Sequence, residues 1–115
     1  MGRLTTHVLD TTRGRPASGM RIDLLRGAGR SDAVKSMSTN ADGRTEAPLL
    51  EGAELQAGVY QLVFHVGEYM RGRGHPDAGK FLEDVPVVFT VDDPDGKYHV
   101  PLLFSPWSYA TYRGS

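Results

Sequence analysis

Two of the four histidines interrupt segments that otherwise have the composition of β-strands. His7 lies in "LTTHVLD" and His99 lies in "KYHVPLLF", where most neighbours are apolar or β-branched. Histidine is the side chain whose ordinary pKa lets it exchange protons near neutral pH, so both residues are candidates for acid–base catalysis. Taken alone, each histidine is also compatible with a structural role in its strand.

A metal site is the other chemistry that a pair of histidines could support, because imidazole binds zinc. The chain has no cysteine and no His-x-x-x-His spacing, and no acidic residue is placed as a convincing third ligand. We therefore predict no metal and no cofactor. The other two histidines, His65 on the outer side of a strand and His75 in the loop "RGRGHPDAG", are predicted to be ordinary surface residues.

Two further places carry side chains that could bind or polarise a substrate. Arg44 directly follows an Asp-Gly turn in "STNADGR", which by itself is typical of a solvent-facing residue. The chain ends in "YATYRGS", where Tyr112, Arg113 and Ser115 bring a phenol, a guanidinium and a carboxylate to a terminus that would ordinarily fray. Such chemistry at the terminus needs an explanation from the fold.

Apolar residues recur at every second position in four segments, which predicts strands with one face in a core. The inward rows are Met20, Ile22 and Leu24; Tyr60, Leu62, Phe64 and Val66; Val85, Val87, Phe89 and Val91; and Tyr98, Val100, Leu102 and Phe104. Gly- and Pro-rich turns separate the runs, and "DDPDGK" predicts a hairpin loop. Only "GEYMRGR" (67–73) indicates a helix. We predict an all-β protein of about eight strands in a two-sheet sandwich.

The same alternation places the candidate side chains outside the core. His7 shares its side of the strand with Leu9, and His99 shares its side with Pro101 and Leu103. Tyr112 lies on the side of the small residues at 108 and 110, which leaves room for a ligand or a neighbouring subunit. Because Leu9, Pro101 and Leu103 would be exposed apolar surface in a monomer, we predict that another subunit covers this face. A proline also favours a strand beside an edge.

Composition narrows the class of protein further. With 115 residues the chain is expected to form one domain, 1–115, that buries a core without disulfides. The net charge is −1, so no basic surface indicates a nucleic acid or an anionic membrane as partner. No apolar run reaches the roughly 18 residues of a membrane helix, and no signal sequence is evident. We expect a cytoplasmic protein.

Four stretches resemble the transthyretin-like family, and in particular its 5-hydroxyisourate hydrolase branch. They are "HVLDTTRGRPASGM", "TNADGR", "KYHVPLLFSP" and the terminal "YRGS", in this order and across essentially the whole chain. "HVLD" and "SPWSYATY" alone would indicate only the wider family. The marks that separate the enzymes from the hormone carriers are His7, Arg44, His99 and the complete Tyr-Arg-Gly-Ser ending, and all are present. Lys97 departs from the pattern, which often has a histidine there.

The resemblance implies a sandwich of two four-stranded sheets with one short helix, assembled as a homotetramer whose central channel holds the active sites. It also implies hydrolysis of 5-hydroxyisourate, in urate degradation, to 2-oxo-4-hydroxy-4-carboxy-5-ureidoimidazoline without metal or cofactor. His7, Arg44 and His99 would be catalytic, with His7, Arg44 and Tyr112 binding the substrate. Arg113 and Ser115 would support the site by holding the terminus.

Two other classes of function stay open from the sequence. A binding module of transthyretin type would carry a small aromatic ligand without chemistry, but it would leave two histidines and Arg44 without a reason. A purely structural β-sandwich would have no converging polar groups and no anchored C-terminus. The sequence does not decide which histidine is the general base.

Overall fold

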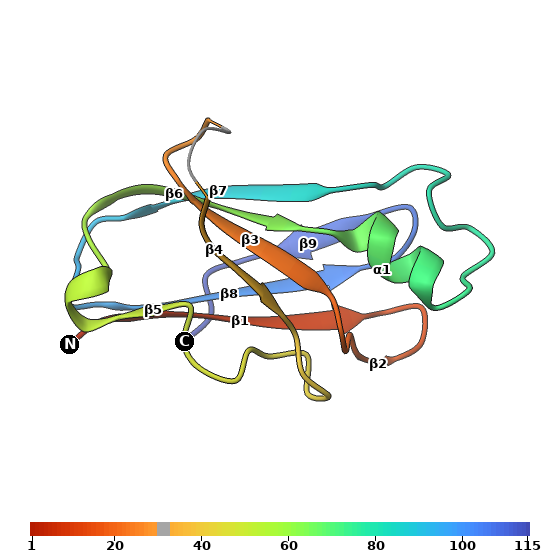
Figure 1. Cartoon of the computed structure of the whole chain (residues 1–115), viewed down its shortest axis with the longest axis horizontal. Coiled ribbons are helices and arrows are strands. Elements are labelled where there is room, and N and C mark those ends of the chain that lie inside the picture. The colour runs from red at the N-terminus through yellow and green to blue at the C-terminus, as the bar shows by residue number, and fades with distance from the viewer. Residues whose placement is uncertain (30–32) are drawn as a thin grey trace.

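The alternating apolar runs form strands, and these strands build two β-sheets packed face to face (Figure 1). The computed structural model describes residues 1–29 and 33–115. The elements are β1 (Arg3–Asp10), β2 (Arg15–Pro16), β3 (Arg21–Arg26), β4 (Ala33–Ser38), β5 (Leu50–Glu51), the 3₁₀ turn η1 (Gly52–Glu54), β6 (Gly58–Phe64), α1 (Val66–Gly72), β7 (Val85–Val91), β8 (Lys97–Phe104) and β9 (Tyr109–Thr111).

One sheet has the order β2-β1-β8-β9, with β5 also paired to β1, and the other has the order β4-β3-β6-β7. The all-β sandwich with one short helix is therefore confirmed. The first sheet has five strands rather than four, because the two-residue strands β2 and β5 both pair antiparallel with the long strand β1. The central pair β1 and β8 runs parallel over the full length of both strands.

The predicted inward rows form the core. Met20 just before β3, Ile22 and Leu24 on β3, and Tyr60, Leu62 and Phe64 on β6 are fully buried. The row on β8 packs against them from the other sheet. Val66, the last residue of the β6 row, begins α1, which lies at the end of the sandwich away from the N-terminus (Figure 1). The predicted helix at 67–73 thus forms one residue earlier than expected.

The segment "DDPDGK" does not form the predicted hairpin. β7 belongs to one sheet and β8 to the other, so this loop crosses between the sheets. Both strands direct an apolar row at the same core, each from the sheet on its own side of the sandwich. Tyr98 fixes the crossing, because its hydroxyl accepts hydrogen bonds from the backbone N–H groups of Asp92 and Asp93 and donates one to the Asp92 carboxylate at 2.5 Å.

The outer face of β8 is covered more than the sequence predicted. Pro101 is buried, and Leu9 and Leu103 are half-buried, because the end of the chain runs beside β8. Pro101 therefore lies in β8, which has neighbours on both sides and is next to the edge strand β9, as the proline predicted. On the side of β8 that faces the end of the chain, β9 pairs with Leu102 to Phe104, and the next bridge joins His99 to Gly114. Pro101 lies between these two pairings, so the N–H that proline lacks is not needed there.

Candidate active site

The parallel pairing of β1 with β8 creates the platform of the site. Thr5 lies directly beside His99 in the ladder, and His7 lies beside Pro101. On β1 the alternate residues Thr6 and Val8 are buried, while Thr5 and His7 are half-buried. Because alternate residues of a strand face the same side, the imidazoles of His7 and His99 project from the same outer face of the sheet.

Arg44 is brought to this face by a tight turn that docks on β1. The side chain of Asn40 accepts hydrogen bonds from the backbone N–H groups of Asp42 and Arg44, which closes the turn. Gly43 has a φ of 74°, and a Cβ there would lie 2.4 Å from the carbonyl oxygen of Val8. Only glycine fits both constraints, and the N–H of Val8 then donates to the Gly43 carbonyl at 2.8 Å.

A cavity of about 560 Å³ opens where this turn meets β1 and β8. Residues that can bind or polarise a ligand line it: Arg3, Arg44, Glu46, Lys97, His99 and Ser115. Three of these side chains are cationic and one is a carboxylate, so the lining favours an oxygen-rich or anionic guest. The volume suits a small heterocycle.

His99 is the titratable group that the cavity perturbs. Burial of the ring lowers its pKa below the ordinary value of 6.5, and the nearby positive charges of Arg44 and His7 lower the pKa further. A histidine with a lowered pKa is neutral at pH 7 and can accept a proton there. The Nδ1 atom of this ring lies 2.9 Å from the Thr5 hydroxyl, which leaves Nε2 as the second nitrogen.

The end of the chain is anchored along β8. The N–H of Gly114 donates to the carbonyl of His99 at 2.7 Å, and Gly114 and His99 form an antiparallel bridge. The guanidinium of Arg113 donates to the carbonyl of Lys97 and lies 4.3 Å from the centre of the Tyr98 ring. These contacts bring Ser115 to the cavity wall.

The structure brings three of the sequence-predicted residues into one cavity and leaves His7, Tyr112 and Arg113 outside its lining. Arg44, His99 and Ser115 line the same cavity, whereas His7 lies close enough to act on His99 through its charge without lining it. Tyr112 is 61% exposed and lines a second, apolar hollow of about 520 Å³ between β7 and the terminal segment. Within one chain, Tyr112 is therefore not part of the cavity that holds Arg44 and His99.

Sequence reasoning missed several contributors to the cavity, among them Glu46. Thr5 contacts His99, while Arg3 and Lys97 pair across β1 and β8 at the cavity wall. The alternation rule that placed His7 outward also places Thr5 outward, two residues earlier on the same strand, so that signal was present. The parallel pairing that joins Thr5 to His99, 94 residues apart, is not visible in the sequence.

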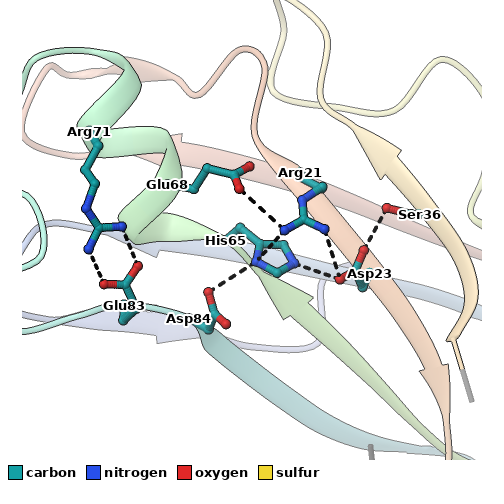
Figure 2. A network of polar contacts seen from close by, with 8 residues as sticks. All are labelled: Arg21, Asp23, Ser36, His65, Glu68, Arg71, Glu83 and Asp84. Carbon is teal, nitrogen blue, oxygen red and sulfur yellow. Dashed lines mark hydrogen bonds and ion pairs between the residues drawn. The ribbon is translucent and has the colours of Figure 1, made fainter. Parts of the chain in front are cut away.

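The prediction that His65 is an ordinary surface residue is wrong. The residue is 9% exposed and lies at the junction of β6 and α1, between two carboxylates (Figure 2). Its Nε2 lies 2.8 Å from Asp23, and its Nδ1 lies 3.2 Å from Asp84. Arg21 joins the same network by contacting Asp23 and Glu68. Strand alternation placed His65 outward correctly, but these groups cover it there.

Neither a metal centre nor a membrane anchor is found in the described part of the chain. Residues 1–29 and 33–115 contain no group of three or more histidine, cysteine, aspartate or glutamate side chains arranged to hold a metal ion. None of the helices in these ranges has the length and hydrophobicity needed to cross a bilayer.

Comparisons with known proteins show which family the chain resembles over nearly its whole length. The model of a family described as HIUase/Transthyretin matches residues 4–114. A curated Rhizobium meliloti protein named 5-hydroxyisourate hydrolase 2 is 55% identical over 117 residues, which cover 99% of this chain and 97% of that protein.

Solved structures of two proteins superpose on nearly the whole chain. A structure of (S)-allantoin synthase superposes with a TM-score of 0.92 at 48% identity; the match covers 99% of this chain but only 44% of that longer one. Sea bream transthyretin in complex with thyroxine superposes with a TM-score of 0.84 at 29% identity, covering 97% of this chain and 94% of that one. The fold is therefore shared by enzymes and by a hormone-binding protein.

Proposed function

Since the chain belongs to the HIUase/Transthyretin family, we propose that it hydrolyses 5-hydroxyisourate to 2-oxo-4-hydroxy-4-carboxy-5-ureidoimidazoline, as one hydrolase domain over residues 1–115. The observation that carries the proposal is the cavity lined by both Arg44 and His99, where the pKa of His99 is lowered and His7 lies nearby. A carrier needs none of these three groups. The reaction belongs to urate degradation, and the proposed mechanism uses no metal and no cofactor.

Ring opening requires one bond to form and one to break. The oxygen of a water molecule bonds to a carbonyl carbon of the six-membered ring, and the bond from that carbon to the ring nitrogen then breaks. The water gives up a proton to a base, and the departing nitrogen takes a proton up. The histidines can transfer both protons, because a single imidazole serves as base and then as acid.

His99 fits the role of proton acceptor because burial and the charges of Arg44 and His7 favour its neutral form. His7 lies on the same face of the sheet and is proposed to orient the water and relay the proton. Both lie on the long parallel pair β1 and β8, which fixes their separation better than loops would. The pH dependence of kcat/KM in the wild type and in variants of each histidine distinguishes the base from the acid.

Arg44 is proposed to bind the carbonyl oxygens of the ring and to stabilise the negative charge that develops on the attacked carbonyl. The planar guanidinium offers paired N–H donors, which suit a planar ring with neighbouring oxygens. A preorganised cation at the developing oxyanion is commonly among the larger contributions to catalysis. The docked turn at 40–44 supplies the preorganisation.

The terminal residues are proposed to complete the site in a homotetramer. Tyr112 would then wall the pocket and hydrogen-bond the substrate, while Arg113 and Ser115 hold the terminus in place. The exposed side chains of Val88 on the edge strand β7, of Tyr109 on the edge strand β9 and of Tyr112 directly after it support an interface between copies at these edges. Light scattering should report a tetramer, and deleting residues 112–115 should lower turnover; a stable, active monomer would refute this part.

The direct test is an absorbance assay with 5-hydroxyisourate made in the cuvette from urate and uricase. The protein should accelerate its decay above the spontaneous rate, and an Arg44→Gln variant should lose most of the acceleration. The similarity to thyroxine-bound transthyretin makes a carrier the alternative. Saturable binding of the substrate without any acceleration would support the carrier and sink the hydrolase.

A further inference from the structure

The imidazole of His99 is contacted along both of its edges. On one edge its Nδ1 atom lies 2.9 Å from the Thr5 hydroxyl oxygen. On the other edge its Cδ2 atom lies against Gly114, so closely that a Cβ added to that glycine would be 2.5 Å from Cδ2 and 3.2 Å from Cγ. The ring is thus held between two segments that are distant in sequence, the start of β1 and the end of the chain.

The requirement for glycine at position 114 comes from this contact and not from the backbone. Gly114 is not among the residues with positive φ, so its conformation would accept other amino acids. A carbon–carbon approach of 2.5 Å is far inside van der Waals contact, so any side chain at 114 must displace the ring or break the bridge. The glycine of "YRGS" therefore provides clearance for the catalytic imidazole.

Both contacts are held by backbone pairing. Thr5 and His99 are direct partners in the parallel ladder of β1 and β8. Gly114 bridges His99 from the other side, and its N–H donates to the His99 carbonyl at 2.7 Å. Since neither neighbour moves independently of β8, the ring has little freedom to rotate.

We propose that Thr5 and Gly114 are positioning residues that hold the His99 imidazole in one orientation. With Nδ1 occupied by Thr5 and Cδ2 against Gly114, Nε2 is the nitrogen left to meet the substrate or the attacking water. This role in catalysis rests on the proposed hydrolase function, whereas the orientation of the ring can be tested without any substrate. A displacement of about 1 Å at a reacting group can cost on the order of 10²-fold in rate.

The first experiment compares Thr5→Val with Thr5→Ser. Valine keeps the shape of threonine but removes the hydroxyl, and we expect kcat to fall roughly 10-fold, the equivalent of one lost hydrogen bond, with little change in KM. Serine keeps the hydroxyl and should restore most of kcat. A serine variant as slow as the valine variant, or a valine variant changed only in KM, would overturn the role of the hydroxyl.

The second experiment compares Gly114→Ala with Gly72→Ala. Gly72 also lacks positive φ, and a Cβ there meets nothing within 4 Å, so it is a matched control that should keep full activity. We expect Gly114→Ala to lower kcat by roughly 10²-fold, because the added methyl displaces the ring. Wild-type kcat in Gly114→Ala would contradict the clearance role.

The third experiment is independent of turnover. In protein carrying labelled histidine, the Hδ2 proton of His99 should show a strong nuclear Overhauser contact to the α protons of Gly114. The contact should persist in Thr5→Ser and in Gly72→Ala, and it should weaken in Thr5→Val as the ring gains freedom. Absence of the contact in the wild type would refute the proposed orientation, even if the protein proved to be a hydrolase. A protein that shows the contact but does not hydrolyse 5-hydroxyisourate would instead refute the function alone.

Discussion

His99 and His65 both leave the core on the outer side of a sheet, yet they lie in opposite surroundings. His99 contacts a neutral hydroxyl through one nitrogen, and the charge next to it is that of the Arg44 guanidinium. His65 contacts carboxylates through both nitrogens, Asp23 at 2.8 Å and Asp84 at 3.2 Å (Figure 2). His65 is the more buried of the two, so burial alone does not single out a catalytic histidine.

The two rings differ in whether a nitrogen remains free to exchange a proton. His99 keeps one nitrogen without a protein partner among the described residues, and cationic neighbours favour the neutral ring that can accept a proton. His65 has both nitrogens engaged and bridges β3, the start of α1 and the segment before β7. We infer that His99 serves the reaction and that His65 holds three elements together. The predictions below test this division, starting from the largest effect.

Replacing His99 by asparagine should lower turnover by about 10²–10⁴-fold, the range for a lost acid–base group. The fold and the assembly should persist, because His99 is only half-buried and β8 pairs on both sides. Steady-state rates with 5-hydroxyisourate, together with light scattering, provide the measurement. Near-wild-type turnover would remove His99 from the mechanism.

Replacing His65 by asparagine should have the converse effect. Half-buried Asp23 and exposed Asp84 would each lose a contact to the ring, and one lost hydrogen bond typically costs about 0.5–1.5 kcal/mol. The free energy of unfolding from urea titration, at one fixed protein concentration, measures the loss. Turnover below the melting range should be unchanged. His75→Asn is the control and should show neither effect, because the only hydrogen bond of the His75 side chain within the described residues is the one that its Nδ1 accepts from the Asp77 N–H, which an asparagine oxygen can also accept. A His65→Asn protein with unchanged stability but reduced turnover would contradict the structural role of His65.

The sequence could predict the strands and the outward direction of His7 and His99, because both follow from an alternation that needs only neighbouring residues. It could not predict the surroundings of either histidine. The Thr5 contact depends on the parallel pairing of β1 with β8, and the Asp23 and Asp84 contacts depend on the approach of segments 42 and 19 residues away. Misplacing "DDPDGK" as a hairpin has the same origin, since alternation does not say which sheet receives a strand.

The charge surroundings of His99 can be tested by changing Arg44. Because the positive charge of Arg44 lowers the pKa of His99, Arg44→Gln should raise that pKa, and His7→Gln should raise it less. NMR titration of the His99 ring measures the pKa without any need for turnover. Arg26→Gln is the control, because the Arg26 guanidinium donates a hydrogen bond to Gln56 and does not contribute to the pKa of His99. This variant should leave the His99 titration unchanged. A fall in the His99 pKa in Arg44→Gln would contradict the account of the cavity.

The two carboxylates beside His65 should contribute unequally to stability, and the contribution of Asp23 should depend on pH. Burial of Asp23 raises its pKa, but hydrogen bonds from Ser36 and His65 and the charges of His65 and Arg21 lower it more, so the net pKa lies below the ordinary 3.8. A carboxylate with a lowered pKa stabilises the fold above its unfolded pKa, and this contribution disappears as the pH falls through its folded pKa.

The difference in unfolding free energy between wild type and Asp23→Asn should therefore be constant near neutral pH and shrink below about pH 4. Asp84 is 49% exposed and lies farther from the ring, so Asp84→Asn should cost only about 0–1 kcal/mol at neutral pH. Urea titrations of both variants across pH 3–7 give the two curves. If Asp84→Asn proved the more costly change, His65 would be held mainly from the β7 side, and the bridge to β3 would not be the contact that orders the network.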